Sequence, residues 1–419
     1  MRQHSHHART ATHWLTCLGF ALLASLARAD DYRISYEVAI APGTELARVE
    51  LRLEGAQLPS KLVLHTDPDR HSDFNASREL VREGDTVSWR PAGTDDVLRY
   101  SFAVNARKDS SSYDSMITDD WAILRSDKLV PPIAVTAARG LRSSARLRFQ
   151  LPAGWSSAAP YAEVPDSEHH YRLTDPGRRF IRPKGWLILG HIASRQDRAG
   201  STSVRVAAPS GQRARLQDTL AFIRWTLPHI QAVVPDFPPR LLVVTADDPM
   251  WRGGLSGPNS LFMHLDRPLI SGNRTSSLVH ELMHVGSGID GTERSDWVVE
   301  GIAEYYAVAV LYRSGAIRER RFQDTLAELA AWGEESKELF TGDSAGATTA
   351  RAVTLLHSLD SELRQLSEGR ASLDDVVTRL SQGGGDITVL ALVETAEAVA
   401  GTRLASLAKV RARLDRTRN

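Results

Sequence analysis

The stretch SLVHELMH (residues 277–284) contains the pattern H-E-x-x-H. On an α-helix, residues four positions apart lie one turn above each other on the same face, so His280 and His284 can direct two imidazole rings at one metal ion. Glu281 lies one step around the helix, where its carboxylate can reach a water molecule at the metal without binding the metal itself. The apolar residues of the stretch fall on the opposite face and can anchor the helix in a core.

A second helical stretch, WVVEGIAE (residues 297–304), offers the third ligand. Two histidines do not hold a catalytic zinc ion, because such a site needs three protein ligands and one open position. Glu300, sixteen residues after His284, can supply the third ligand from a helix packed against the first. Glu304 lies one turn later on the same face, where it can accept the outer N–H of a ligand histidine and fix its tautomer.

Together these residues predict a catalytic zinc site. One Zn²⁺ per chain would be held by His280, His284 and Glu300, and would lower the pKa of a bound water from about 15.7 towards 7. Glu281 is then the general base that accepts the proton of this water during attack on a carbonyl. H-E-x-x-H also occurs by chance, and E-G-x-x-E can be a solvated helix face. The helical placement and the spacing of all three features favour metal binding.

Composition excludes several other classes of protein. The 419 residues include 51 basic and 51 acidic side chains, for a net charge of zero without long runs of either sign. We therefore expect neither a nucleic acid nor an anionic membrane surface as the main partner. This length can bury at least one sizeable core in two or three domains.

The N-terminus has the pattern of a signal peptide over residues 1–29. A positively charged start precedes a short apolar run (residues 15–26), and Ala27-Arg28-Ala29 forms an A-x-A cleavage site. We expect export, to the periplasm or the medium, and no membrane span after cleavage, because no other stretch approaches a membrane-spanning length. The single cysteine, Cys17, is removed with this segment. Any metal site in the mature chain must therefore use histidine and carboxylate ligands.

The remaining chain divides into two regions with different periodicity. Residues 30–208 show alternating apolar and polar residues between Gly/Pro/Asp clusters, which predicts an N-terminal antiparallel β domain, either a sandwich or a curved sheet. Residues 209–419 have mostly helical spacing, which predicts an α+β chain with a largely helical second domain. The expected helices cover 213–234, 276–287, 296–313, 319–334, 347–366, 373–381 and 388–399, and the expected strands cover 241–245 and 260–265.

These motifs resemble those of the gluzincins, the zinc metallopeptidases that include thermolysin and aminopeptidase N. Within this group the sequence is most similar to the glycyl aminopeptidase family. Gly253-Gly254-Leu255 precedes the zinc motif as that family's Gly-Gly-Leu-Glu-His signature does. The segments 151–155 and 358–375 resemble its N-terminal β domain and its helical C-terminal region. The resemblance implies a β domain followed by a thermolysin-like catalytic domain, with Gly253, Gly254, Leu255 and Ser256 at the substrate.

Two positions depart from the family pattern. Ser256 stands where the signature has a glutamate that is expected to pair with the free amino terminus of a substrate, and serine carries no charge to hold an amine. Thr349 stands where such enzymes place a tyrosine against the tetrahedral oxyanion, and no tyrosine follows Tyr312. Losing one oxyanion donor typically costs about two to three decades in rate. His357 or Tyr305 would be the substitute donor, or the enzyme would be slow.

The sequence thus predicts an exported zinc metallopeptidase that acts on peptides or proteins. Whether it is an endopeptidase or an aminopeptidase stays open. The alternative is a catalytically weak or inactive zinc-containing protein that binds peptides, although an intact Glu281 argues against a purely structural site. A zinc hydrolase of non-peptide substrates is a third possibility.

Overall fold

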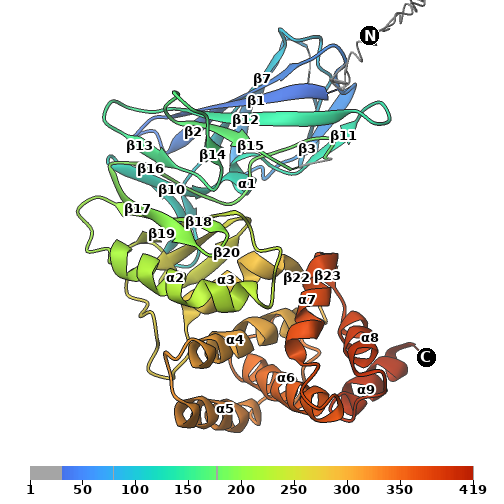
Figure 1. The fold of residues 1–419 in the computed structure, drawn as a ribbon. Coiled ribbons are helices and arrows are strands. Elements are labelled where there is room, and N and C mark those ends of the chain that lie inside the picture. The colour runs from blue at the N-terminus through green and yellow to red at the C-terminus, as the bar shows by residue number, and fades with distance from the viewer. Residues whose placement is uncertain (1–30, 79, 176–177, 419) are drawn as a thin grey trace, which may run out of the picture.

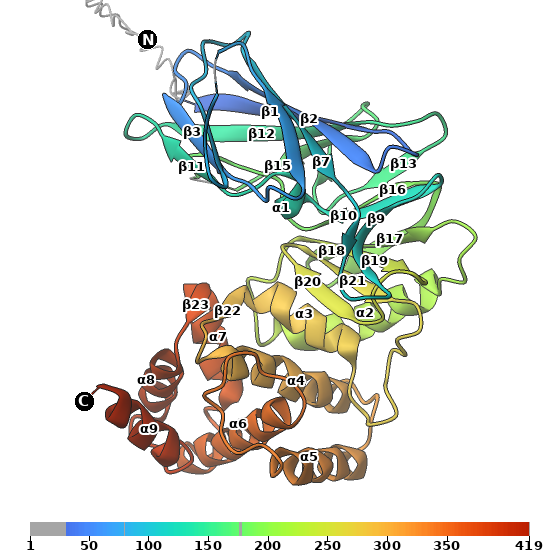
Figure 2. The same cartoon turned by 180° about the vertical axis from the view of Figure 1, so that it is seen from behind.

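The structure is a computed structural model, and it describes residues 31–78, 80–175 and 178–418. The predicted signal peptide, residues 1–29, lies outside the described residues. Within the described part of the chain, no helix combines the length and the apolar character needed to cross a bilayer. The described residues form a β domain, a central sheet and a helical region, in that order along the chain (Figures 1 and 2).

A seven-stranded sheet forms the upper layer of the N-terminal β domain (Figure 1). In spatial order its strands are β14 (Ala162–Glu163), β15 (His170–Leu173), β12 (Arg142–Gln150), β1 (Asp31–Ile40), β2 (Leu46–Glu54), β7 (Val97–Ala103) and β4 (His71–Asn75). Its pairs are antiparallel except for β1 and β12, which run parallel. Alternate residues of β1 from Tyr32 to Ile40 are buried, so the period-two pattern places one apolar face on the core.

Two smaller sheets complete the β domain. One contains β11 (Ile133–Thr136), β3 (Lys61–His65), β6 (Thr86–Trp89) and β5 (Val81–Glu83) in that order. The other contains β13 (Ser156–Ala158), β16 (Trp186–Gly190), β10 (Trp121–Arg125), β9 (Tyr113–Ile117) and β8 (Ala106–Arg107), and the short helix α1 (Ser126–Leu129) follows β10. Buried side chains such as Tyr36, Trp89 and Phe102 join the sheets in one core. This arrangement confirms the predicted, mainly antiparallel β domain.

A central mixed sheet connects the β domain to the helical region. Its order is β17 (Ile192–Ala199), β18 (Thr202–Pro209), β19 (Arg240–Ala246), β21 (Ser260–His264) and β20 (Gly254–Gly257), which leaves β20 at one edge. Helices α2 (Leu216–Gln231) and α3 (Ser277–Ser287) pack on one face (Figure 1). The other face packs against β10 and β16, where Trp186 and Phe262 are buried together.

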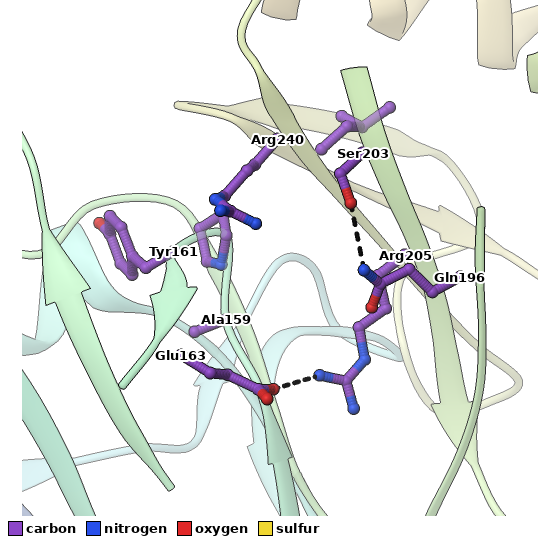
Figure 3. Close-up of a pocket in the computed structure, with 9 residues that line it drawn as sticks. Ala159, Tyr161, Glu163, Gln196, Ser203, Arg205 and Arg240 are labelled. Atoms are coloured by element: carbon purple, nitrogen blue, oxygen red, sulfur yellow. Dashed lines mark hydrogen bonds and ion pairs between the residues drawn. The ribbon is translucent and has the colours of Figure 1, made fainter. Parts of the chain in front are cut away.

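This sheet begins earlier in the chain than the predicted domain boundary at residues 208–209. Strand β17 and all but the last residue of β18 precede that boundary, yet β18 pairs in parallel with β19. An alternating pattern identifies strands but does not say which sheet they join, so the sheet pairing places residues 192–209 with the second domain. An ion pair of 2.9 Å between Arg205 on β18 and Glu163 on β14 links the two parts across a small pocket (Figure 3).

The rest of the chain is helical. It contains α4 (Asp296–Arg313), α5 (Glu319–Gly333), α6 (Ala347–Leu366), α7 (Leu373–Gly383), α8 (Val389–Ala400) and α9 (Ala408–Arg418). Two short parallel strands, β22 (Ile289–Gly291) and β23 (Gly385–Ile387), join the start of α4 to the end of α7. Neither these strands nor α9 is predicted by the sequence. Helices α2, α3, α4, α6 and α7 share one hydrophobic core, which fixes α3 against α4.

Candidate metal centre

Local signals determine where α3 begins and ends. The Ser276 side chain accepts a hydrogen bond of 3.3 Å from the Val279 N–H and caps the helix N-terminus. The helix ends at Gly288, whose φ of 57° is left-handed and therefore favours glycine, and whose N–H donates to the His284 carbonyl. Leu278, Leu282 and other apolar side chains of α3 are buried. The opposite face therefore carries the histidines.

Helix α4 is held in place by contacts at its N-terminus. The Ser295 hydroxyl donates a hydrogen bond of 2.6 Å to the Ile387 carbonyl in β23. The Asp296 carboxylate accepts one of 2.6 Å from the Ser344 N–H. Most side chains of α4 are buried, including Trp297 and Ile302, so its position is fixed by packing on several sides.

The structure brings the three predicted zinc ligands together. The Nε2 atoms of His280 and His284 lie 3.0 Å apart. The Glu300 carboxylate oxygens lie 3.3 Å from His280 Nε2 and 3.4 Å from His284 Nε2. Glu304 lies on the other side of His280, with a carboxylate oxygen 3.0 Å from its Nδ1. Among the described residues, one donor atom from each of the three ligands falls within 4.8 Å of the others.

The pKa values of these groups show that this cluster attracts positive charge. Burial opposes a charged His280, but hydrogen bonds to Glu300 and Glu304 outweigh it and raise the pKa of His280 to about 10. Burial and the charged His280 lower the pKa of His284 to about 4. For Glu300, burial favours the neutral acid, yet its hydrogen bond to His280 lowers the pKa below its usual value. In the absence of a metal ion, a proton on His280 therefore offsets part of the negative charge of Glu300 and Glu304. A divalent cation would neutralise this charge more fully.

The residues fit a zinc ion by donor chemistry. Two imidazole nitrogens and one carboxylate form a ligand set used by catalytic zinc sites, and the cleft side remains open. The contact between Glu304 and His280 Nδ1 gives this ring the outer partner that ligand histidines usually have. The converging Nε2 atoms of His280 and His284 repel each other unless a proton or a metal ion lies between them.

Glu281 lies beside the edge strand β20. A Cβ atom at Gly254 would lie 2.8 Å from the Cγ and Oε1 atoms of Glu281, so a side chain at position 254 would collide with this carboxylate. Ser256 lies beside the Glu281 carboxylate and favours its charged form. Burial raises the pKa of Glu281 and the charge of Glu300 raises it further, against the effects of His280 and Ser256. A higher pKa makes this carboxylate a better proton acceptor near neutral pH.

A cleft of about 1050 Å³ opens over these residues. Of the four residues predicted to bind substrate, Gly254, Leu255 and Ser256 line it, whereas Gly253 is buried against the Trp251 ring. Several charged residues that line the cleft were missed by sequence reasoning. Arg125, Asp127, Arg182 and Lys184 come from the β domain and are remote from the motif, whereas Asp290 and Asp296 follow α3 closely but belong to no recognised pattern.

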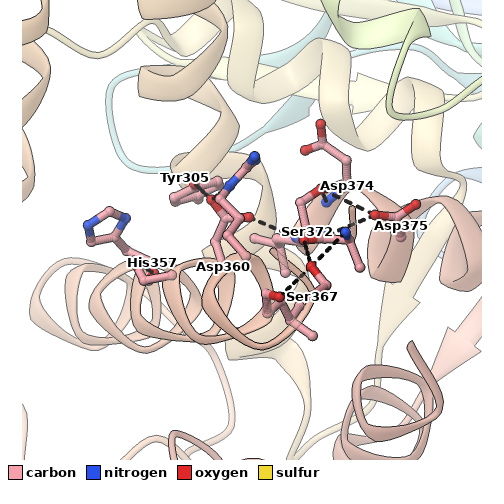
Figure 4. A network of polar contacts seen from close by, with 12 residues as sticks. Tyr305, His357, Asp360, Ser367, Ser372, Asp374 and Asp375 are labelled. Carbon is pink, nitrogen blue, oxygen red and sulfur yellow. Dashed lines mark hydrogen bonds and ion pairs between the residues drawn. The ribbon is translucent and has the colours of Figure 1, made fainter. Parts of the chain in front are cut away.

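No tyrosine lines the described part of the cleft. Tyr305 donates a hydrogen bond of 3.1 Å to Asp360, and His357 lies near it on α6, so neither proposed oxyanion donor reaches the cleft (Figure 4). The same carboxylate accepts hydrogen bonds from Arg364 (2.9 Å) and from the Leu373 N–H (2.8 Å). This network, which we call the Asp360 network, fastens α4, α6 and α7 together.

A second group of possible ligands contains Asp247, Asp248 and the buried His264. His264 Nδ1 accepts a hydrogen bond of 3.1 Å from the Asp266 N–H, so the neutral ring carries its proton on Nε2. That nitrogen faces Asp248 Oδ1 at 3.4 Å. A protonated Nε2 has no lone pair for a metal ion, so this group is an imidazole–carboxylate pair.

No protein-family model matches this sequence, and no curated protein sequence matches it. Solved structures match it in fold. An aminopeptidase N family protein from Idiomarina loihiensis superposes with a TM-score of 0.61 at 16% identity, covering 84% of this chain and 70% of that chain. An M1 zinc metallopeptidase from Deinococcus radiodurans has a TM-score of 0.57 at 16% identity, and the match covers 92% of both chains.

A variant of a two-domain M1 zinc metallopeptidase with L-arginine bound also matches, with a TM-score of 0.57 and 16% identity over 89% of this chain and 91% of that chain. These neighbours confirm the predicted gluzincin fold class, whereas the narrower resemblance to glycyl aminopeptidases stays a prediction. The chain has the two-domain fold of the M1 zinc metallopeptidases.

Proposed function

We propose that this protein is a zinc-dependent metallopeptidase. The observation that carries the proposal is the convergence of His280 Nε2, His284 Nε2 and the Glu300 carboxylate at one point, with Glu281 on the same cleft. The fold shared with M1 zinc metallopeptidases supports it. A zinc ion held there would supply a Lewis acid that polarises a carbonyl and makes water acidic.

Each nearby residue has a distinct task in this proposal. Glu304 fixes the His280 ring through Nδ1, so that Nε2 faces Glu300 and His284. Glu281 accepts a proton from water and passes it to the leaving amine. Ser256 favours the charged form of the Glu281 carboxylate, and Gly254 leaves room for it. The raised pKa of Glu281 suits both halves of this proton transfer.

We also propose that cleavage does not require a free amino terminus. An amine cation in a partly dry site needs an anion or several acceptors. At position 256 the chain offers a serine, which carries no charge. A series of peptides with free and with acetylated amino termini tests this point, because strict dependence on the free amine would contradict it.

We propose that the protein works outside the cytoplasm, in the periplasm or the medium. The pattern of residues 1–29 supports export, and a zinc site without thiolates suits an oxidising compartment. Sequencing the amino terminus of the protein recovered from its cells checks this proposal. A mature start near residue 30 is expected.

The decisive experiment compares wild-type protein with the Glu281→Gln variant on a mixed peptide library. The variant should retain one zinc per chain by metal analysis, and its cleavage should fall by about 10²–10⁴-fold, the usual contribution of a general base. Equal cleavage by the two proteins would contradict the mechanism. If neither zinc-loaded protein cleaves any peptide, the alternative of a zinc-containing peptide-binding protein is favoured. That alternative is supported by the lack of a tyrosine along the described part of the cleft.

A further inference from the structure

The two walls of the cleft carry opposite charges. On the β-domain side, the charged lining residues are Arg125, Arg182 and Lys184, with Asp127 as the one carboxylate among the described residues. The wall at the start of α4 carries Asp290 and Asp296, and Asp236 also lines the cleft. We call the first set, Arg125, Asp127, Arg182 and Lys184, the cationic wall. It has a net charge of +2, so it favours an anionic group of a bound molecule.

Both arginines of the cationic wall are fixed by hydrogen bonds. Arg125 pairs with the Asp127 carboxylate at 3.0 Å and neutralises it. The Nη1 atom of Arg182 donates to the carbonyl oxygens of Asp127 (3.0 Å) and Val130 (2.7 Å), which are neutral acceptors. The charge of Arg182 is therefore not matched by a carboxylate of its own, although the side chain is held in place.

Lys184 differs from the arginines because its ammonium group has no hydrogen bond and no ion pair within 4 Å among the described residues. Its side chain is half-buried beside Arg178 and Arg182, and burial together with these two cations lowers its pKa, while Asp175 and Asp127 act in the opposite direction. Both carboxylates already form an ion pair with an arginine, Asp175 with Arg178 at 2.9 Å and Asp127 with Arg125 at 3.0 Å. A partly desolvated ammonium without a direct ion pair is unfavourable, and a bound carboxylate would supply a charge-assisted hydrogen bond.

Lys184 lies next to the strand that borders the metal centre. A Cβ atom at Gly185 would lie 2.3 Å from the Pro258 carbonyl, so the backbone after Lys184 is in close contact with the turn that follows β20. Trp186 strengthens this contact by donating from Nε1 to the Leu255 carbonyl at 2.9 Å. A peptide that added to the free edge of β20 would thus pass the metal centre and the cationic wall in succession.

We propose that the cationic wall, through Lys184, binds a carboxylate of the peptide substrate and gives the enzyme a preference for acidic peptides. This inference rests on the proposed peptidase function. The carboxylate is either an aspartate or glutamate side chain or the free carboxyl terminus of the peptide. Asp290 and Asp296 on the opposite wall repel the same group, which fixes its side of the cleft.

The test measures peptide affinity in the zinc-loaded Glu281→Gln protein, so that binding is separated from turnover. Paired peptides differ only by glutamate against glutamine at one position, or by a carboxyl terminus against a carboxamide. We expect the acidic member of at least one pair to bind roughly tenfold more tightly, which is about 1.4 kcal/mol. The pair that discriminates identifies the source of the carboxylate.

Three further variants in the same background assign the preference to Lys184. Lys184→Gln should reduce the affinity ratio of the discriminating pair to below threefold, whereas Lys184→Arg should preserve most of it. Lys128→Gln is the matched control, because Lys128 is an exposed lysine on α1 that does not line the cleft, and it should leave the ratio unchanged. An unchanged ratio in Lys184→Gln, or no discrimination in the parent protein, would overturn the inference.

The outcomes also separate this inference from the proposed function. Discrimination that depends on Lys184, without cleavage of any peptide by the wild type, would leave the inference standing and refute the peptidase. Cleavage that depends on Glu281 but shows no preference for acidic peptides would support the peptidase and refute the inference. A parent protein that binds none of the peptides would overturn the inference directly.

Discussion

Helix α4 contributes to two polar clusters that differ in whether their hydrogen bonds are complete. Glu300 and Glu304 belong to the metal centre, while Tyr305, the next residue, belongs to the Asp360 network. In the Asp360 network, both carboxylate oxygens of Asp360 accept hydrogen bonds, and Arg364 balances the charge. In the metal centre, two ring nitrogens and a carboxylate converge within 3.4 Å and face an open cleft.

This difference separates a stabilising cluster from a binding one. A buried polar group whose hydrogen bonds are complete has nothing left to offer a ligand, and it fixes the fold. Donors that converge on one point, with their remaining directions free, bind a cation that satisfies all of them together. Residue type alone does not make this distinction, because both clusters contain carboxylates and both include a side chain of α4.

The largest effects are expected when one carboxylate charge is removed from each cluster. Glu300→Gln should weaken zinc binding by more than about 100-fold and abolish cleavage. This exceeds the loss of about 10- to 100-fold that is typical for residues that only hydrogen-bond to a metal ligand. Asp360→Asn should retain zinc and lose about 1–3 kcal/mol of stability, because Arg364 and Tyr305 lose a charged acceptor. Zinc titration and thermal melting of both variants check the pair. Loss of zinc in Asp360→Asn would contradict the separation.

A smaller effect is expected at the edge of the metal centre. Glu304→Gln keeps the shape of the side chain but weakens its contact with His280 Nδ1, so zinc affinity should fall by roughly 10- to 100-fold. Competition with a zinc chelator of known affinity measures this change. If the variant binds zinc as tightly as wild type, Glu304 does not support the ligand.

The charge state of the metal-free centre predicts a pH dependence. At neutral pH His280, with a pKa of about 10, carries a proton that zinc must displace, whereas His284, with a pKa of about 4, does not. Zinc affinity should therefore rise by about tenfold per pH unit between about pH 5 and 6.5, with one proton released per ion, before ionisation of the bound water adds a second. Calorimetry in buffers of different ionisation enthalpy counts this proton. Release of two protons at about pH 5.5, where bound water is not ionised, would refute the assignment.

The smallest effect is expected for Tyr305→Phe. This change removes one hydrogen bond to Asp360 and should lower the free energy of unfolding by about 1 kcal/mol. Cleavage should stay within about twofold of wild type, because the hydroxyl points into the Asp360 network and away from the cleft. A loss of about 10²–10³-fold in kcat would instead identify Tyr305 as an oxyanion donor.

The two clusters also show what the sequence can reveal. Helix α4 has the predicted bounds, and helical periodicity is sufficient to place His280 with His284 on one face of α3 and Glu300 with Glu304 on one face of α4. The packing of α3 against α4 then brings the two faces together. The fate of Tyr305 could not be predicted, since its partner Asp360 lies 55 residues later. Similarly, Lys184 reaches the cleft through contacts between sheets, which leave no local pattern in the sequence.

The position of both clusters on one helix has a consequence for shortened forms of the protein. Residues of α6 and α7 complete the Asp360 network. In β23, which follows α7, the Ile387 carbonyl accepts a hydrogen bond from the Ser295 hydroxyl at the start of α4. A chain truncated before residue 373 would lose the Leu373 N–H donor and the strand that anchors α4, although the proposed zinc ligands His280, His284 and Glu300 would still be present. The segment from residue 373 onward therefore helps to hold α4 and the proposed ligand Glu300 in place, although it supplies no proposed ligand itself.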